Sequence, residues 1–165
     1  MTATQTKVKA AWVNPFLSPA QTVWQAMLGC DLILEGAELV SHQFTTEDLT
    51  AVIGVSGKLE GNVLYGFGGH CAQAAVAKMM EQPEVNEIDQ MGLSALGEIA
   101  NVITGNAATL LADNGWPCEI SPPVIIEPAG SRFTTVAANQ ILVTFNSDMG
   151  VLRIRIALSE NHRKK

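Results

Sequence analysis

The chain has 165 residues, of which 47% are hydrophobic and only 16% are charged. This composition excludes a disordered protein, because disorder requires low hydrophobicity and high charge. Sixteen acidic against ten basic residues, and 5% aromatic residues, argue against a nucleic-acid-binding protein, which needs a basic surface and stacking side chains. The apolar content is high for so few charges and indicates that some of it is buried against another chain.

The cysteines and the amino terminus exclude several further classes. Three scattered cysteines, Cys30, Cys71 and Cys118, do not make a disulfide framework and are expected to be reduced thiols. His70–Cys71 has no second ligand pair at a suitable spacing, so no metal site is expected. No signal peptide is recognisable, and no stretch approaches the ~18 apolar residues of a membrane span. We therefore expect a soluble, cytoplasmic protein.

The first half of the chain is predicted to contain two helices and three strands. Residues 1–13 are expected to be a flexible lead-in, and Asn14–Pro15 opens a helix that ends at Gly29. Strand-like runs follow at residues 32–44, 49–56 and 59–67, with Gly57–Lys58 as a tight turn between the last two. A short helix is predicted over residues 70–80.

The second half is predicted to contain one long helix and three further strands. The helix spans residues 84–112, and a proline-rich segment (SPPVIIEP) then carries an extended strand. Residues 139–145 and 149–158 form a hairpin, and the basic tail 161–165 is expected to fray. This order predicts a single α/β (α+β) domain over residues 14–160, with a largely antiparallel sheet, about three helices and two similar halves.

The long helix has two different faces. On a helical wheel, an apolar stripe faces the core: Leu93, Leu96, Ala100, Ile103, Ala107, Leu110 and Leu111. A second row lies roughly opposite and is called here the Glu98–Asn101 face: Ser94, Glu98, Asn101, Gly105, Ala108 and Ala112. Because residues three apart are neighbours on a helix, Glu98 and Asn101 point the same way among very small side chains.

This face is unusual for a solvated helix, which normally carries long charged residues. Gly105 alone costs about 1 kcal/mol relative to alanine in a helix interior. Periodicity leaves two interpretations open. Either Gly97, Gly105 and the alanines let another helix of the same domain pack closely, with Glu98 and Asn101 in a boundary salt bridge and hydrogen bond, or the face receives a second protein.

The same residues resemble the motif helix of the CheC/CheX/FliY family of chemotaxis phosphatases. That motif is Glu-x-x-Asn, followed by a small residue and then Asn-Ala, and here it reads Glu98-Ile99-Ala100-Asn101 and Gly105-Asn106-Ala107. VNPFLSPAQTVWQAML resembles the first helix of the family, and GNVLYGFG with the Ala- and Met-rich helix after it resembles the middle. CheC-type members carry a second Glu-x-x-Asn on the first helix. Its absence here is the CheX-like arrangement.

The resemblance implies a hydrolase that removes phosphate from the aspartate of a CheY-type response regulator and ends a chemotaxis-type two-component signal. The regulator would supply Mg²⁺ and most of the electrostatic stabilisation, so no cofactor of the chain's own is implied. Asn101 would orient the attacking water, because an amide both donates and accepts hydrogen bonds without carrying charge. Glu98 would pair with the regulator's lysine. Ser94, Gly105 and Ala108 would let the regulator approach closely.

The resemblance also implies a homodimer with a sheet continued across subunits, burying apolar surface from runs such as residues 141–145 and 151–158. Two alternatives to the enzyme stay open from the sequence. One is a non-catalytic adaptor that binds a response regulator through the Glu98–Asn101 face. The other is a structural dimer in which this face packs on its own copy.

Overall fold

A computed structural model describes residues 9–45, 49–127 and 132–163 of the chain. Its helices are α1 (Ala10–Leu28), α2 (His70–Met79) and α3 (Gln90–Asp113). Its strands are β1 (Ile33–Thr45), β2 (Leu49–Gly57), β3 (Leu59–Phe67), β4 (Cys118–Ile120), β5 (Val124–Ile126), β6 (Arg132–Ser147) and β7 (Gly150–Glu160).

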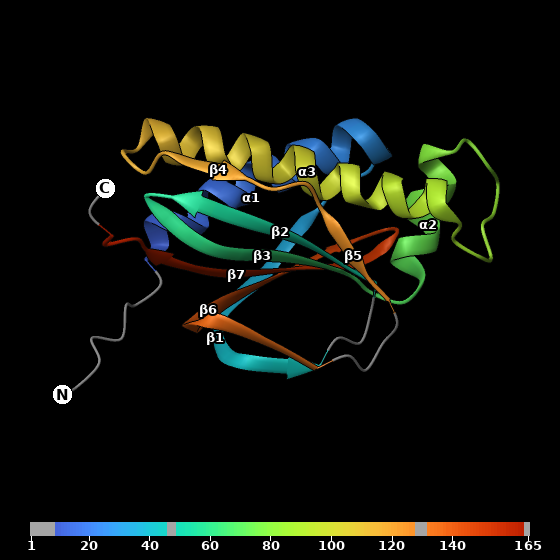
Figure 1. The fold of residues 1–165 in the computed structure, drawn as a ribbon. Coiled ribbons are helices and arrows are strands. Elements are labelled where there is room, and N and C mark those ends of the chain that lie inside the picture. Colours follow the sequence, from blue (N-terminus) through green and yellow to red (C-terminus); the bar gives the residue numbers. More distant parts are fainter. Residues whose placement is uncertain (1–8, 46–48, 128–131, 164–165) are drawn as a thin grey trace.

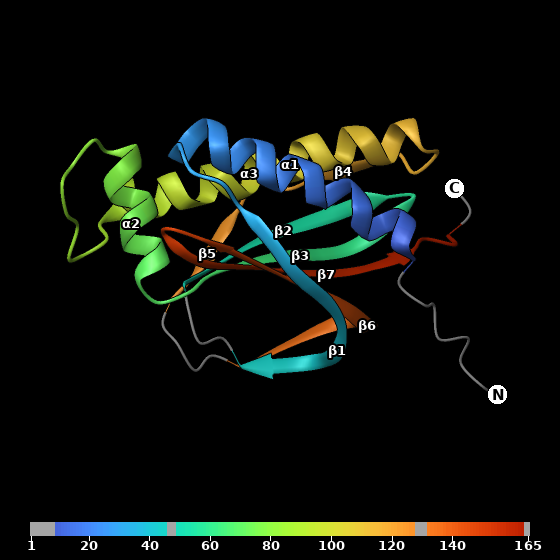
Figure 2. The same cartoon turned by 180° about the vertical axis from the view of Figure 1, so that it is seen from behind.

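The strands form one sheet in the order β1-β6-β7-β3-β2-β4, and the short β5 also pairs with β2. Every pairing is antiparallel. Helices α1 and α3 lie side by side across the same face of this sheet, and α2 lies near the beginning of α3 (Figures 1 and 2). The predicted mixed α/β fold, with three helices on a largely antiparallel sheet, is confirmed. Each half of the chain contributes one long helix followed by strands.

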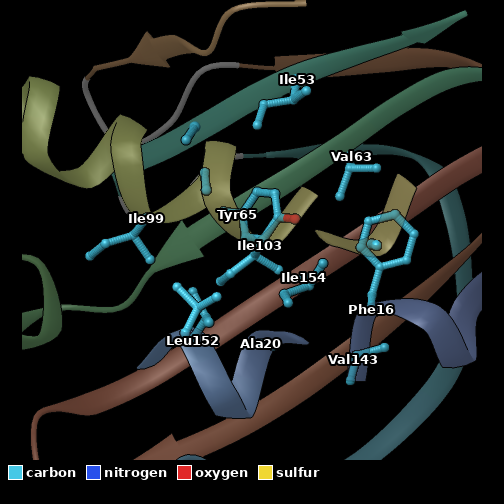
Figure 3. Close-up of a cluster of buried hydrophobic side chains, with 14 of the residues drawn as sticks. Phe16, Ala20, Ile53, Val63, Tyr65, Ile99, Ile103, Val143, Leu152 and Ile154 are labelled. Atoms are coloured by element: carbon cyan, nitrogen blue, oxygen red, sulfur yellow. The ribbon is translucent and has the colours of Figure 1, made fainter. Parts of the chain in front are cut away.

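The core fills the space between this helix layer and the sheet. Figure 3 shows side chains from both long helices meeting those of the sheet strands around Tyr65. Strand β7 alternates in the way a half-covered strand should, with Leu152 and Ile154 buried and the intervening Arg153 only half-buried. The largest fully buried side chains include Trp12, Trp24, Tyr65, Phe16, Phe67 and Phe145.

Helix α1 begins at Ala10, four residues before the predicted start at Asn14–Pro15. Residues 10–13 therefore belong to the fold and not to a lead-in, whose residues 1–8 lie outside the described part of the chain. The cause is packing: Trp12 is fully buried, and its ring lies edge-on to Trp116 with 5.5 Å between centroids. Tertiary burial of this kind stabilises a helix turn that local signals alone would not extend.

Helix α3 begins at Gln90, whereas the sequence predicted a start at Glu84. Asp89 is the N-cap residue, and its carboxylate accepts a hydrogen bond from the Gly92 N–H at 2.9 Å. The segment before Asp89 is hydrogen-bonded to α2 instead, because the Gln73 side-chain amide donates to the Asn86 carbonyl at 2.8 Å. The helix is therefore six residues shorter at its amino terminus than the periodic pattern predicts.

Strand bounds agree with prediction to within a residue for β1 to β3, but β6 starts earlier than predicted, at Arg132. Strands β6 and β7 both lie inside the sheet with a partner on each side. Residues 141–145 and 151–158 therefore cannot be where the sheet continues into a second subunit, because each strand is already paired on both sides within this chain. Their fully buried side chains belong to this chain's own core: Val143, Phe145, Leu152, Ile156 and Leu158.

The carboxyl terminus is ordered further than expected. The Asn161 backbone N–H donates to the Lys58 carbonyl at 2.9 Å, and its side-chain amide donates to the Gly57 carbonyl at 3.0 Å. The predicted fraying at residue 161 is wrong, because Asn161 is hydrogen-bonded to the β2–β3 turn. Residues 164–165 lie outside the described part of the chain.

Candidate functional site

Helix α3 has α1 along one side and the β4–β5 segment along the other (Figures 1 and 2). The sheet and α1 both cover α3, so the buried face of this helix is wider than the helical wheel predicted. Ile99, which is not in the predicted apolar stripe, is also fully buried. Two members of the predicted apolar stripe are not core residues: Leu93 is half-buried and Leu110, in the last turn, is 39% exposed. The other members are buried as predicted: Leu96, Ala100, Ile103, Ala107 and Leu111.

The Glu98–Asn101 face lies at the surface. Glu98 is exposed and Asn101 is half-buried beside it, and among their small neighbours Ser94 is exposed while Gly105 and Ala108 are half-buried. Glu98 is the only charged residue of α3 before its last residue, Asp113. The outer side of a long helix thus presents one carboxylate and one amide among small, uncharged side chains.

Both polar side chains lack a partner within the described part of the chain. Among the residues that the structure describes, neither the Glu98 carboxylate nor the Asn101 amide forms a hydrogen bond or an ion pair. The interpretation that placed them in a boundary salt bridge and a structural hydrogen bond is therefore wrong. Their hydrogen-bonding groups are available to another molecule.

The two glycines of this region have different reasons for being small. A Cβ at Gly97 would lie 3.2 Å from Cγ of Pro123 and 3.7 Å from Cδ1 of Ile125, so glycine lets the β4–β5 segment pack tightly on the helix. A Cβ at Gly105 would meet only Cδ1 of Ile120, at 4.0 Å, which is an ordinary contact. Close packing within the domain therefore explains why residue 97 is glycine, although the element that packs there is an extended segment and not a helix. The same reason does not explain Gly105.

A buried hydrogen bond fixes how α3 sits on the sheet. The Thr104 hydroxyl donates to the Ala100 carbonyl at 2.7 Å, so the Tyr65 hydroxyl, 2.6 Å from the Thr104 oxygen, must be the donor to Thr104. Burial raises the pKa of Tyr65 far above its ordinary value and keeps the phenol protonated. Because Thr104 follows Asn101 by less than one helical turn, this bond helps set the direction in which Asn101 points.

We expect Thr104→Val to destabilise the protein by about 1–3 kcal/mol, since it leaves the Tyr65 hydroxyl buried without an acceptor. Tyr65→Phe removes the donor and leaves Thr104 bonded to Ala100, so its cost is expected to be smaller, about 1 kcal/mol. The double variant is expected to cost less than the sum of the two. Urea unfolding of all three variants measures these differences, and equal costs that simply add would contradict the assigned direction of the bond.

Other features of the structure do not extend this site. One hollow of about 660 Å³ lies between the end of α1, the start of β1 and the β6–β7 turn, and contains no residue of the Glu98–Asn101 face. Within the described ranges, no three His, Cys, Asp or Glu side chains gather as they would to hold a metal ion. No helix of those ranges is long and apolar enough to cross a membrane. Cys30, Cys71 and Cys118 form no disulfide bond.

Comparison with known proteins gives one consistent answer. The sequence profile of the family described as chemotaxis phosphatase CheX matches residues 49–146. The CheY-P phosphatase CheX of Thermotoga maritima is 32% identical over 114 residues, which cover 69% of this chain and 74% of that protein. The crystal structure of CheX from Vibrio vulnificus superposes with a TM-score of 0.81 at 24% identity, covering 91% of this chain and 100% of the other.

A further structure is that of a CheX–CheY–BeF3–Mg²⁺ complex from Borrelia burgdorferi, which matches with a TM-score of 0.65 at 24% identity over 90% of this chain and 98% of that one. The fold is thus that of the chemotaxis proteins related to CheX. Sequence and profile together go further: the chain belongs to the CheX family of chemotaxis phosphatases.

The sequence found the central pair of this site but missed its surroundings. The Glu-x-x-Asn spacing identified Glu98 and Asn101 and placed them on one exposed helix face. The extended strand predicted in SPPVIIEP is β5, but the short strand β4 before it and the packing of this segment beside α3 were not predicted. Contacts between segments that are far apart in sequence leave no periodic signal, and Gly97 alone does not say what packs against it.

Proposed function

We propose that this chain hydrolyses the aspartyl phosphate of a CheY-type response regulator, in the cytoplasm, and so ends a chemotaxis-type signal. One observation carries the proposal: in a chain of the CheX family, Glu98 and Asn101 lie at the surface of α3, three residues apart, with no partner among the residues that the structure describes. The name of the Thermotoga relative, CheY-P phosphatase, and the Borrelia complex of CheX with CheY support the same substrate class.

The reaction requires a water molecule in line with the phosphorus. Water attacks, the bond between phosphorus and the aspartate oxygen breaks, and the products are inorganic phosphate and a free carboxylate. An acyl phosphate is already reactive, so holding the water in position supplies much of the remaining acceleration. The Asn101 amide suits this role, because its oxygen accepts a hydrogen bond from the water and no negative charge opposes the phosphate.

Glu98 has a different role in this proposal. It lies just under one helical turn before Asn101, and its exposed carboxylate can pair with the lysine of the regulator's active site. Such a pair fixes the register in which α3 docks and therefore where Asn101 arrives. The neighbouring side chains are short or absent, at Ser94, Gly105 and Ala108, so the regulator's pocket can approach the helix closely. The required Mg²⁺ comes with the regulator, and the chain contributes no metal of its own.

The proposal is tested against the set of receiver domains of the source organism. Each receiver domain is phosphorylated with a small acyl-phosphate donor, and the donor is then removed. The loss of phosphate from the receiver is followed with and without this chain. We expect at least one receiver to lose phosphate faster. Binding to phosphorylated receivers without any acceleration would overturn the enzymatic proposal in favour of the adaptor.

We expect Glu98→Gln to raise KM for the phosphorylated regulator about tenfold and to lower kcat less, since the lost charge-assisted hydrogen bond acts mainly in docking. Initial rates over a range of regulator concentrations separate the two constants. Glu84→Gln, at an exposed acid outside α3, is the matched control and should behave as the wild type. An unchanged KM in Glu98→Gln would contradict the docking role.

We also propose that two copies pair through β1. This strand lies at the edge of the sheet and exposes Ile33 at 63%, Leu34 at 42% and Leu39 at 65%. An apolar, unpaired edge is a template for another strand, and a second copy would continue the sheet and cover these side chains. In this proposal the sheet continues into the second copy through β1, and not through the interior strands β6 and β7.

Leu39→Asp is expected to shift the chain from dimer to monomer in sedimentation velocity, because a carboxylate in a paired apolar edge is costly to bury. Its far-ultraviolet circular dichroism should stay that of the wild type, since Leu39 is largely exposed in the single chain. Val124→Asp, on β5 at the opposite edge of the sheet and similarly exposed at 62%, should stay dimeric. A monomeric wild type would contradict this proposal.

A further inference from the structure

A buried polar contact lies beneath the Glu98–Asn101 face, between α3 and the sheet. The Tyr65 hydroxyl donates to Thr104 and the Thr104 hydroxyl donates to the Ala100 carbonyl, in a core that is otherwise largely apolar (Figure 3). Among the residues that the structure describes, the Tyr65–Thr104 bond is the one hydrogen bond that joins α3 to a strand. The hydrophobic effect has no direction, whereas a hydrogen bond requires a defined distance and angle. This contact therefore sets the position of α3 on the sheet.

Stability alone does not require this polar pair. Tyr65 is fully buried and Thr104 is 1% exposed, so their hydroxyls lose water on folding and regain only each other and one carbonyl. Phenylalanine and valine have nearly the same shapes and would fill the same space without polar groups. Replacing both partners of a buried hydrogen bond by apolar groups of the same shape can be nearly neutral. What the polar pair adds is a defined geometry, as satisfied buried networks do.

The hydrogen bonds end at the peptide group that leads into Asn101. The Ala100 carbonyl, which accepts from the Thr104 hydroxyl at 2.7 Å, belongs to the peptide bond between Ala100 and Asn101. Because a peptide group is planar, fixing its carbonyl also fixes the N–H and the Cα of Asn101. A hydroxyl bonded to the carbonyl four residues earlier often bends a helix slightly, so it affects the direction of the side chain at that point.

Asn101 has little other support from its own helix. It lies between the exposed Glu98 and the buried Thr104 in a row of residues three apart. Its neighbours four residues away on either side are Gly97 and Gly105, which have no side chain to hold the amide in one rotamer. Glycine also gives a helix interior more backbone freedom than alanine does. The direction of the Asn101 amide therefore depends on how firmly its backbone is held.

We propose that the Tyr65–Thr104 pair is a positioning device for Asn101 during hydrolysis of the phosphorylated regulator. Tyr65 fixes Thr104 to β3, which is paired along its whole length with β7, and Thr104 fixes the peptide that carries Asn101. Both hydroxyls are buried and do not reach the regulator, so they act only through the amide. A displacement of about 1 Å can lower a rate by about 100-fold. This inference rests on the proposed phosphatase function.

The test compares wild type with Tyr65→Phe/Thr104→Val, which replaces both hydroxyls by apolar groups of similar shape. Its unfolding temperature should lie above that of Thr104→Val alone, because no hydroxyl is left unpaired. We nevertheless expect kcat to fall about tenfold, with KM for the phosphorylated regulator and the dissociation constant for its beryllofluoride form within about twofold of wild type. Tyr65→Phe alone, the mildest change, should lower kcat about threefold.

Two further variants separate positioning from general loosening of the core. Thr104→Ser keeps a hydroxyl at the same place and should keep kcat within about twofold of wild type. Ile154→Val is the matched control, because Ile154 is paired with Tyr65 across β3 and β7 and is buried in the same core. It removes a methyl group, lowers the unfolding temperature and leaves the polar pair intact, so kcat should not change.

The outcomes distinguish this inference from the proposed function. If wild type accelerates phosphate loss from no receiver, the proposed function is wrong. If wild type is active and Tyr65→Phe/Thr104→Val keeps its kcat, only the positioning inference is wrong. A change confined to KM also overturns it, because it would place the pair in docking. An equal fall of kcat in Ile154→Val would show that any loosening of this core slows the reaction, and it would contradict a specific role for the two hydroxyls.

Discussion

Replacing Asn101 with alanine is expected to lower kcat for regulator dephosphorylation about 100-fold. If the amide holds the attacking water in line with the phosphorus, its loss removes about 3 kcal/mol of transition-state stabilisation. Asn101 is half-buried and makes no hydrogen bond to the residues described, so stability should change little. The dissociation constant for the regulator should stay within about threefold, because Glu98 still pairs with it.

Decay of the phosphorylated regulator under single-turnover conditions measures this effect. Asn86→Ala is a matched control, since Asn86 is an exposed asparagine outside α3 whose backbone carbonyl, and not its side chain, is hydrogen-bonded. Asn101→Asp is a second variant and is expected to be no more active than Asn101→Ala, because its carboxylate repels the phosphate. Full activity in Asn101→Ala would contradict the assigned mechanism while leaving the family assignment intact.

The largest effect on stability is expected at Gly61, in β3. Its φ of +143° is one that side chains disfavour, and a Cβ there would lie 2.0 Å from the carbonyl oxygen of Ala157 in the neighbouring β7. Because the obstacle is backbone in the middle of a sheet, it cannot move aside cheaply. We expect Gly61→Ala to cost about 3 kcal/mol or more, a large part of the about 5–15 kcal/mol that stabilises a typical domain.

Thermal unfolding followed by circular dichroism, with Gly66→Ala as the control, tests this expectation. Gly66 lies in the same strand, but a Cβ there would be 3.8 Å from the nearest atom, the Arg153 carbonyl oxygen. Gly66→Ala should therefore unfold close to the wild-type temperature, while Gly61→Ala unfolds well below it or accumulates as insoluble protein. Similar unfolding temperatures for the two variants would show that the β3–β7 pairing is looser than described.

Much of the fold could be predicted because local signals matched the final structure. Strand-like runs separated by Gly57–Lys58 became β2 and β3, and the small-residue helix carrying Glu98 and Asn101 became α3. The errors came from tertiary packing. Burial of Trp12 against Trp116 extends α1, and the hydrogen bond of Asn161 to the β2–β3 turn orders the tail. Neither interaction is visible in periodicity.

The site divides in the same way. Its chemistry could be predicted because a carboxylate and an amide at a spacing of three must share a helix face. Its boundary could not, because the β4–β5 segment reaches α3 only through the folding of the sheet. The apolar, charge-poor composition is explained in part by the β1 edge, where three of the exposed large apolar side chains of the described residues lie and where a second copy is proposed to pair.

The central claim is that this chain accelerates loss of phosphate from an aspartate of a CheY-type regulator through α3. The most direct measurement is the decay rate of that purified, phosphorylated regulator in the presence of Mg²⁺ as the chain is added in increasing amounts. We predict a rate that rises at least tenfold and saturates with wild type, and that stays near the spontaneous rate when the same amounts of Asn101→Ala bind the regulator. A wild type that binds the phosphorylated regulator and leaves its decay at the spontaneous rate would contradict the account.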